Sequence, residues 1–253
     1  MKVVILAGGL GSRLSEETAL RPKPMVEVGG RPILWHILNI YSAHGFNDFI
    51  VAGGYRAEVI KRYFYDFVLE HSDVVIDTEK NERGFANIQV PKWKVRVVDT
   101  GVSSQTAGRI AKLKSSLDST FMVTYGDGVA DVDVAALVKF HKSHGRIATV
   151  TAVHPPPRFG NLHVQDNRVM SFSEKPLEEA LINGGFFVFE PKIFEYLTED
   201  VPLEREPMER LTRDGQLMAY SHPGFWHPMD TIRDKQLLEQ MWAEGRAPWK
   251  VWP

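Results

Sequence analysis

Short apolar runs alternate with helix-like segments over the first 153 residues of the chain. A continuous apolar run that ends in glycine predicts a strand buried on both faces of a sheet, and an apolar stripe at every third or fourth position predicts a helix. Regular alternation of the two predicts right-handed βαβ crossovers, a parallel sheet and helices on both of its faces. The predicted strands lie at 2–7, 48–54, 95–101, 120–128 and 148–153, and the predicted helices at 32–45, 57–71, 107–117 and 133–145.

The pattern changes after residue 153. The predicted elements there are two antiparallel strands within 162–172, joined at Asp166-Asn167, one strand at 182–191, and helices at 207–215 and 231–245. An insertion at 79–93 has the mixed polarity of a hairpin or a mobile flap. We therefore expect a single α/β domain over 1–253, with a mixed, mostly parallel sheet and a small β-rich C-terminal elaboration.

Composition narrows the classes of function. The 253 residues include no cysteine, which excludes disulfides, thiolate metal sites and cysteine nucleophiles. The formal net charge of −2 offers no basic field for nucleic acid or for an anionic membrane surface. No apolar stretch approaches the roughly 18 residues of a membrane span, and the N-terminal run is too short for a signal peptide. We expect a soluble, cytoplasmic protein.

The segment LAGGLGSRL (6–14) follows the first predicted strand and carries most of the chemical information. A glycine-rich loop at this place can cradle phosphates with its backbone N–H groups. Two familiar versions do not match: a dinucleotide fingerprint needs a third glycine where Leu14 stands, and a P-loop needs a Gly-Lys pair. The alternative for a glycine cluster alone is a tight strand–helix turn.

Two basic residues favour the phosphate interpretation. Arg13 comes just after the glycines, and Lys23 stands between Pro22 and Pro24. The two prolines restrict the backbone around the lysine and so limit where its ammonium can lie. A held lysine and a guanidinium beside bare amides suit a triphosphate better than a dinucleotide.

These motifs resemble those of the sugar-1-phosphate nucleotidyltransferases, in which L-A-G-G-x-G-[ST]-R-L is followed about ten residues later by K-P. Other matching stretches, among them VDTG, TYGDGVADVD, HPPPRFG, SFSEKP, INGGFFVFEP and HPGFWHPMDTIRDK, extend the resemblance over nearly the whole chain. Pro157 stands where we would expect glycine. The nucleotide-binding residues that the resemblance implies here are Leu6, Ala7, Gly8, Gly9, Leu10, Gly11, Ser12, Arg13 and Lys23, with Arg13 and Lys23 also in catalysis.

The resemblance also implies a fold and a reaction. The fold would be the Rossmann-like one of the nucleotide-diphospho-sugar transferases, with 1–153 as the nucleotide-binding core and 154–253 as the sugar-phosphate-binding and C-terminal portion. The chain is most similar to members that join CTP and α-D-glucose 1-phosphate into CDP-glucose and pyrophosphate, for deoxysugar or surface-polysaccharide synthesis. Such members form homo-oligomers, including hexamers. The alternatives are dTTP or UTP as donor, another hexose 1-phosphate, or a catalytically silent binding module.

Two aspartates would hold the metal. The resemblance assigns Mg²⁺ to Asp127, which follows a predicted strand, and to Asp230, about a hundred residues later. The alternative for each is a turn or N-cap aspartate. Asp131 and Asp133 are predicted to cap the helix at 133–145, where carboxylates favour the positive end of the helix dipole.

On the sugar side, the resemblance assigns Lys175 to the sugar phosphate and Glu174 to the sugar hydroxyls. Asn183 offers an amide that both donates and accepts, and Gly184 permits close approach of the backbone to the sugar. The alternative is a hairpin with a bulge at the glycine pair.

By the same resemblance, the candidate contacts near the nucleobase are Ser104 and Arg109, and Gly126 is a further nucleotide-binding residue. The alternative for Arg109 is a surface arginine in the first turn of a helix.

Two further groups of side chains are predicted to be structural. His141 and His144 are expected on a solvated helix face, since no third metal ligand lies near them in the sequence. The C-terminal tail with Trp249 and Trp252 is too short to fold alone, so it packs on its own domain or on another subunit.

Overall fold

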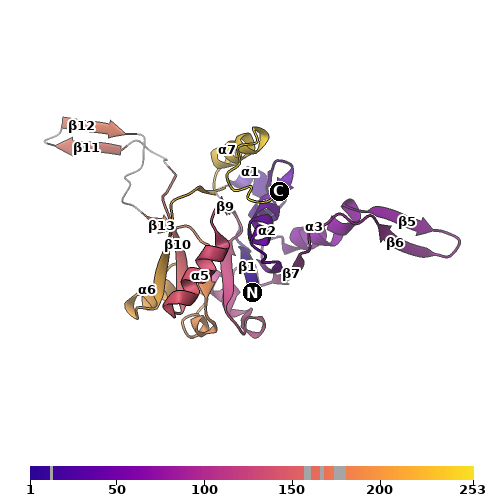
Figure 1. The fold of residues 1–253 in the computed structure, drawn as a ribbon, viewed down its shortest axis with the longest axis horizontal. Helices are drawn as coiled ribbons and strands as arrows, with labels where there is room; N and C mark the ends of the chain where they lie inside the picture. Colours follow the sequence, from indigo (N-terminus) through magenta and orange to yellow (C-terminus); the bar gives the residue numbers. More distant parts are fainter. Residues whose placement is uncertain (12–13, 157–160, 166–167, 174–180) are drawn as a thin grey trace.

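The structure of the protein is a computed structural model, and it describes residues 1–11, 14–156, 161–165, 168–173 and 181–253. The strands of its main sheet are β1 (Lys2–Ala7), β4 (Asp48–Gly53), β7 (Lys94–Asp99), β8 (Phe121–Tyr125), β10 (Ala148–Val153), β13 (Ile182–Asn183), β14 (Phe187–Phe189) and β15 (Leu217–His222). Within the described residues these eight strands follow the order β13-β10-β14-β8-β1-β4-β7, with β15 paired to β10 (Figure 1).

The sheet is mixed and mostly parallel, as the sequence predicts. Strands β8, β1, β4 and β7 pair in parallel, and so do β10 and β15. Strand β14 lies between β8 and β10 and is antiparallel to both. Because β14 comes from the C-terminal half of the chain, it separates two strands, β8 and β10, that strand–helix alternation alone would place side by side.

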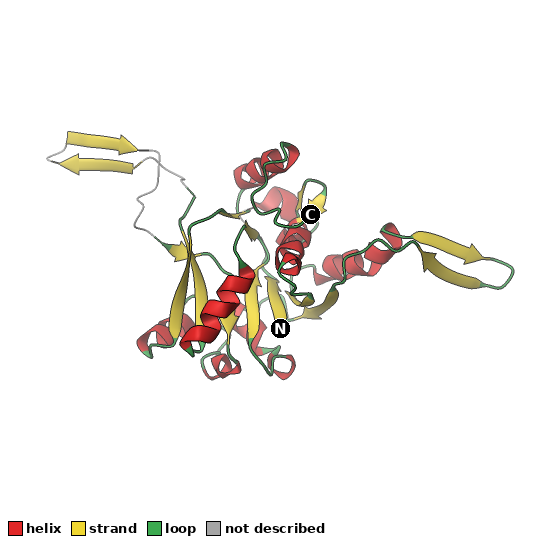
Figure 2. Ribbon diagram, viewed as in Figure 1, coloured by secondary structure: helices red, strands yellow, loops and turns green. Residues whose placement is uncertain are grey.

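Helices cover both faces of this sheet (Figure 2). Along β1, Val3 and Ile5 belong to one buried apolar cluster and Val4 and Leu6 to another, as the period of two in a strand requires. Helices α2, α3 and α5 contribute to the first cluster, and α4 and α6 to the second. The α-helices are α1 (Ser15–Thr18), α2 (Ile33–Ala43), α3 (Ala57–Glu70), α4 (Thr106–Ala111), α5 (Val134–His144), α6 (Glu206–Arg213) and α7 (Ile232–Ala243).

Smaller elements surround the main sheet. The 3-10 helices are η2 (Lys23–Met25), η3 (Lys114–Ser116) and η4 (Pro191–Glu195). The short two-stranded sheets pair β2 (Glu27–Val28) with β3 (Arg31–Pro32), β5 (Asp73–Asp77) with β6 (Glu82–Ala86), β9 (Gly128–Ala130) with β16 (Trp226–Pro228), and β11 (Asn161–Gln165) with β12 (Arg168–Ser173). Among the described residues, no helix combines the length and the apolar character that crossing a bilayer requires.

The two predicted hairpins are both present. The predicted pair within 162–172 is β11 and β12, and its expected turn pair, Asp166-Asn167, lies outside the described residues, as does Pro157. The insertion predicted at 79–93 is the second hairpin, β5–β6, but its strands begin earlier, at Asp73. It projects from the end of α3, away from the main sheet (Figure 1).

The C-terminal tail packs on its own domain. Trp249 is fully buried, and its ring lies beside those of His36, Trp242 and Phe225. Nε2 of His36 lies 2.8 Å from the Val28 carbonyl oxygen. Nδ1 of the same ring accepts a 3.3 Å hydrogen bond from Nε1 of Trp249. Burial lowers the pKa of His36 to about 4, so the imidazole is neutral at physiological pH.

Three sequence predictions are corrected here. The predicted strand at 182–191 is divided into β13 and β14, because Gly185 and Phe186 both have positive φ and interrupt the pairing with β10. Asp133 caps α5 through a 2.9 Å bond from the Ala136 N–H, but Asp131 instead lies 2.9 Å from Nε2 of His222.

The third correction concerns the histidine pair on α5. His141 is 1% exposed rather than solvated, because the face of α5 that carries it packs toward β10 and β14. His144 is half-buried beside it.

Candidate active site

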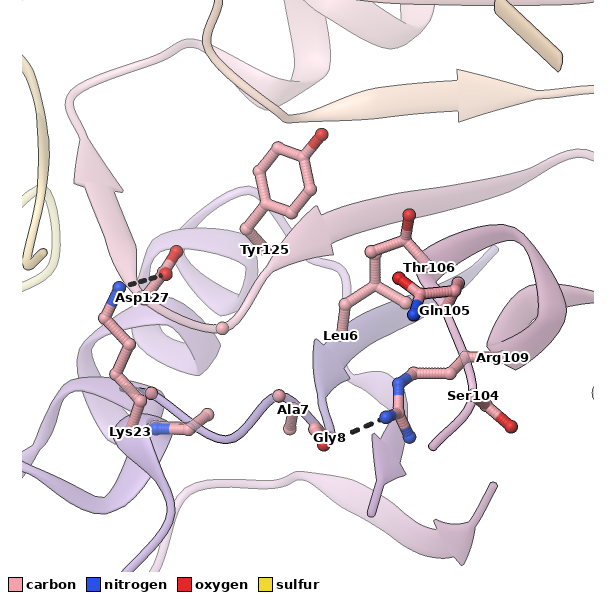
Figure 3. A pocket seen from close by; sticks show the side chains of 14 residues that line it. Leu6, Ala7, Gly8, Lys23, Ser104, Gln105, Thr106, Arg109, Tyr125 and Asp127 are labelled. Atoms are coloured by element: carbon pink, nitrogen blue, oxygen red, sulfur yellow. Dashed lines mark hydrogen bonds and ion pairs between the residues drawn. The ribbon is translucent and has the colours of Figure 1, made fainter. Parts of the chain in front are cut away.

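A cleft of about 290 Å³ opens where β1 and β8 end at the C-terminal edge of the parallel strands (Figure 3). Open α/β sheets bind their ligands at this edge. The lining residues are Leu6, Ala7, Gly8, Gly9, Gly11, Lys23, Pro24, Ser104, Gln105, Thr106, Arg109, Tyr125, Gly126 and Asp127. Most of the residues predicted for the nucleotide therefore meet here, whereas Leu10 points outward, 59% exposed.

Three positions of the cleft favour glycine, two because a side chain would clash and one because of its backbone conformation. A Cβ at Gly8 would stand 2.0 Å from Nη1 of Arg109, and one at Gly126 would stand 2.7 Å from the Leu6 carbonyl oxygen. Gly11 has φ +65°, a region that L side chains rarely adopt. These contacts hold the end of β1 against its neighbours and leave backbone, rather than side chains, at the cleft surface.

Three charged side chains from distant parts of the sequence converge beside this cleft. Lys23 Nζ lies 2.6 Å from Oδ2 of Asp127 and 2.6 Å from Oδ1 of Asp230. Lys23 belongs to η2, Asp127 follows β8, and Asp230 directly precedes α7, whose N-cap is Thr231. Burial lowers the pKa of Lys23, but the two carboxylates outweigh that effect and raise it above its usual value.

The carboxylate pair fits a divalent cation. Oδ2 of Asp127 and Oδ1 of Asp230 each lie 2.6 Å from Lys23 Nζ, so the distance between the two oxygens is no more than the sum of these two distances. The two carboxylates can therefore face one small ion. Mg²⁺ commonly takes one or two protein carboxylates and completes its octahedron with substrate phosphates and water. Within the described residues no group of three or more His, Cys, Asp and Glu forms a metal site made of protein alone. Thr231, not Asp230, caps α7, which excludes the N-cap alternative for Asp230.

Arg109 is buried and holds the walls of the cleft together. Its Nη1 donates to the carbonyls of Gly53 and Gly101 over 3.1 and 2.8 Å, and its Nη2 donates to that of Gly8 over 2.9 Å (Figure 3). It is 3% exposed, which is not the surface arginine of the alternative prediction. In this arrangement Arg109 holds together the backbone of three segments, and the one at Gly8 lines the cleft.

Ser104 also lines the cleft, and its hydroxyl forms hydrogen bonds within the protein. Its hydroxyl donates to the Thr100 carbonyl over 2.7 Å and accepts from Lys112 Nζ over 2.6 Å.

The sugar-side predictions are only partly within the described structure. Asn183 is exposed at the end of β13, and its Nδ2 donates to the Tyr125 hydroxyl over 3.0 Å. Gly184 is buried, and a Cβ there would stand 2.6 Å from Cγ1 of Val153. The remaining predicted residues, Ser12, Arg13, Glu174 and Lys175, lie outside the described residues.

Sequence reasoning missed four residues of the cleft wall, namely Pro24, Gln105, Thr106 and Tyr125. Tyr125 carries the clearest signal in retrospect, because it directly precedes the Gly126-Asp127 pair at the end of a buried strand. Its hydroxyl donates to a carboxylate oxygen of Glu204, a residue from the loop before α6. No local pattern marks Glu204.

Comparison with known proteins identifies relatives of the chain. The family model described as nucleotidyl transferase matches residues 2–227. A glucose-1-phosphate cytidylyltransferase of Salmonella typhi is 52% identical over 256 residues, which cover 100% of both chains. A protein of Bacillus subtilis (strain 168), described as a probable glucose-1-phosphate cytidylyltransferase, is 44% identical and also covers 100% of both chains.

Among solved structures, a UDP-glucose pyrophosphorylase complexed with UDP-glucose is similar in fold. Its TM-score is 0.69 at 16% identity, and the match covers 97% of this chain and 99% of that chain. Since the family model matches nearly the whole sequence and the Salmonella relative matches all of it, the chain belongs to the nucleotidyl transferase family.

Proposed function

We propose that this protein transfers the cytidylyl group of CTP to α-D-glucose 1-phosphate and releases CDP-glucose and pyrophosphate. The observation that carries the proposal is the convergence of Lys23, Asp127 and Asp230 beside a glycine-walled cleft. That convergence occurs in a chain 52% identical, over its full length, to a glucose-1-phosphate cytidylyltransferase. Phosphoryl transfer of this kind needs positioned cations and backbone donors more than it needs covalent chemistry.

The reaction joins two anions in line. An oxygen of the sugar phosphate forms a bond to the α-phosphorus of CTP, while the bond from that phosphorus to the β-phosphate oxygen breaks and pyrophosphate leaves. In our proposal, the backbone of Gly8, Gly9 and Gly11 faces the phosphates of CTP. Lys23, which is held in place and positively charged, neutralises the charge that builds on them, and Arg13 adds a second cation.

We assign the cofactor as Mg²⁺ and its protein ligands as Asp127 and Asp230. When bound, such an ion would offset the negative charge of the substrate phosphates. The task of the chain is to hold the two carboxylates at one point. Asp127 does so from the end of β8, and Asp230 does so from the residue before the Thr231 cap of α7.

The remaining site residues divide between the two substrates. Ser104, Arg109, Gly126 and the loop from Leu6 to Gly11 border the nucleotide, with Arg109 acting through the backbone that it holds. Lys175 binds the sugar phosphate. Glu174, Asn183 and Gly184 face the sugar.

We also infer that the protein works as a homo-oligomer, and a hexamer agrees with the resemblance described above. One face of the β5–β6 hairpin carries Val74, Ile76 and Phe85, which are 47%, 62% and 51% exposed. A two-stranded hairpin is marginally stable in water by itself, so a second copy of the chain is the occupant we assign to this face. Light scattering should show dissociation of the Ile76→Lys variant; an unchanged mass would contradict the assignment.

The function is tested by pyrophosphate release from CTP, UTP, dTTP, ATP and GTP, each with glucose 1-phosphate. A site that pairs with the C4 amine and N3 acceptor of cytosine leaves buried groups unpaired against uracil or thymine. We expect CTP to exceed UTP and dTTP by at least roughly tenfold in kcat/KM, which corresponds to about 1.4 kcal/mol. Equal use of dTTP or UTP would overturn the cytidylyl assignment and leave the broader nucleotidyl transfer.

A further inference from the structure

A chain of hydrogen bonds crosses the cleft from its sugar side to its nucleotide side. It begins at Asn183, whose Nδ2 donates to the Tyr125 hydroxyl over 3.0 Å. The Tyr125 hydroxyl in turn donates to Oε1 of Glu204. The second oxygen of that carboxylate accepts a bond of 3.1 Å from the hydroxyl of Thr106, in the first turn of α4. Tyr125 and Thr106 both line the cleft, and both are labelled in Figure 3.

The donor and acceptor inventory gives this chain one consistent direction. Each hydroxyl has a single hydrogen, and both Tyr125 and Thr106 give theirs to Glu204. The Thr106 oxygen also accepts a 2.6 Å bond from the Leu203 N–H, which fixes its orientation. Glu204 must therefore act as an ionised carboxylate that accepts on both oxygens. A glutamine of the same shape has only one acceptor oxygen and would lose one of the two links.

The loop that carries Glu204 is braced against the start of α4. Oδ1 of Asp200 accepts a 2.7 Å bond from the Gln105 N–H. A Cβ at Gly108 would stand 2.0 Å from the same Asp200 oxygen, so the loop fits closely against this helix only because residue 108 is glycine. This close fit holds Glu204 at the level of Thr106 and Tyr125.

Asn183 is held at both ends of its amide. Oδ1 accepts a 2.8 Å bond from the Gly185 N–H, and Nδ2 uses one hydrogen on Tyr125. One amide hydrogen and one lone pair of Oδ1 remain for sugar hydroxyls. Loss of the Tyr125 hydroxyl would free the amide to turn away from that orientation.

We infer that Tyr125 and Glu204 are positioning residues that couple the two halves of the cleft. Tyr125 orients the Asn183 amide for the sugar, and Glu204 ties Tyr125 to the nucleotide wall through Thr106. The inference rests on the proposed function, in which Asn183 faces the sugar. It adds two residues whose hydroxyl and carboxylate act through others rather than on the reacting phosphates.

The first test is a double-mutant cycle in the pyrophosphate-release assay. Tyr125→Phe should raise KM for glucose 1-phosphate roughly three- to tenfold, the effect of one neutral hydrogen bond, and leave KM for CTP within about twofold. If Tyr125 acts through Asn183, the double variant Tyr125→Phe/Asn183→Ala should match Asn183→Ala alone. Factors that multiply would overturn the positioning role, as would a Tyr125→Phe variant with an unchanged KM for the sugar phosphate.

The second test separates coupling from a local effect. Glu204→Gln should raise KM for both substrates, since it breaks a bond to Thr106 or to Tyr125; an effect on neither would contradict the coupling. Tyr196→Phe is the matched control, because its hydroxyl lies 3.0 Å from Oδ2 of Asp214, outside the cleft. It should leave both KM values unchanged.

The proposed function is judged separately, on the wild type alone. A wild-type protein that releases no pyrophosphate from CTP and glucose 1-phosphate refutes the function. An active wild type with additive variants refutes only the positioning role.

Discussion

Two polar clusters lie at opposite edges of the same sheet, and they differ in net charge and in access to the cleft. At the C-terminal edge of β8, two carboxylates face the single ammonium of Lys23 beside an open cleft. At the opposite edge, His141 and His144 of α5 meet Thr149 of β10 and Glu190 after β14. Both clusters combine chemistry-bearing residues at short spacing, but only the first borders the cleft.

The histidine cluster has one consistent arrangement of hydrogens. The Arg146 N–H donates to Nδ1 of His144, so a neutral His144 carries its hydrogen on Nε2 and donates to the Thr149 oxygen. The Thr149 hydroxyl then donates to Nδ1 of His141, and Nε2–H of His141 donates to Glu190. Burial lowers the pKa of His141, although Glu190 opposes this, so the neutral form is favoured.

The comparison teaches that a buried polar cluster away from the cleft contributes to stability, whereas a cluster of charges beside the cleft is the candidate for function. Every ring nitrogen of the histidine cluster has a partner within the protein, so the cluster stabilises the fold. The cleft brings like-charged carboxylates together in a position that substrate phosphates and a cation can reach. Substitutions in the histidine cluster should therefore change the stability of the protein, and substitutions in the carboxylate cluster should change its kinetics.

The largest expected effect is on turnover when a carboxylate of the cleft is removed. Asp127→Asn or Asp230→Asn should lower kcat about a hundred- to a thousandfold, because preorganised charge stabilisation at the transferring phosphate is lost. Steady-state pyrophosphate release measures it. The control is Asp133→Ala, which removes the N-cap of α5 and should cost about 1 kcal/mol of stability with activity retained. A fully active Asp127→Asn protein would refute the metal assignment.

The second expected effect separates the two lysines. In the proposed function each lysine binds a substrate phosphate, and the loss of one charge-assisted contact costs roughly 1.5–3 kcal/mol, or on the order of ten- to a hundredfold. Lys23→Ala should damage CTP binding or catalysis, and Lys175→Ala should weaken glucose 1-phosphate far more than CTP. Initial rates at varied concentrations of each substrate measure this split. Equal damage to both substrates from both variants would show that the division is wrong.

The third expected effect lies at the opposite edge of the sheet. His141→Ala removes the acceptor of the Thr149 hydroxyl hydrogen and one donor to Glu190, and it should lower the free energy of unfolding by about 2 kcal/mol. Urea denaturation measures the loss. The kcat of the folded variant should stay within about twofold of wild type, and a much larger kinetic loss would break the distinction between the two clusters.

The smallest expected effect is a pH dependence of stability. The folded pKa of His141 lies below its unfolded value of about 6.5, so the unfolded state binds more protons below that pH. Its contribution to stability is present above pH 6.5 and is lost as pH falls through the folded pKa. As the pH is lowered from 7.5 to 5, the urea midpoint of unfolding should fall less for the His141→Gln variant than for the wild type. Parallel curves would contradict this contribution.

Much of the core could be predicted from the sequence, because buried parallel strands are continuous apolar runs and helices repeat with period 3.6. The glycine loop could also be predicted, since only glycine permits the approach of Arg109 at Gly8 and the φ of +65° at Gly11. That Asp127 and Asp230 act at one point was expected from the family resemblance, and neither the resemblance nor any local pattern predicted that Lys23 contacts both.

What could not be predicted depends on pairings between distant segments. The insertion of β14 between β8 and β10 is set by the packing of the whole sheet. Tyr125 and Glu204 are 79 residues apart, and no periodicity records their contact. His141 was predicted to be solvated because the sequence of a helix does not show which other elements pack against its polar residues.

The central claim is that the cleft joins CTP to glucose 1-phosphate at the α-phosphorus, and ³¹P NMR of the reaction tests it most directly. The wild-type protein with CTP, glucose 1-phosphate and Mg²⁺ should produce the two coupled signals of CDP-glucose and the signal of pyrophosphate in equal molar amounts. Substrate signals that persist unchanged, or the appearance of CMP in place of CDP-glucose, would contradict the account.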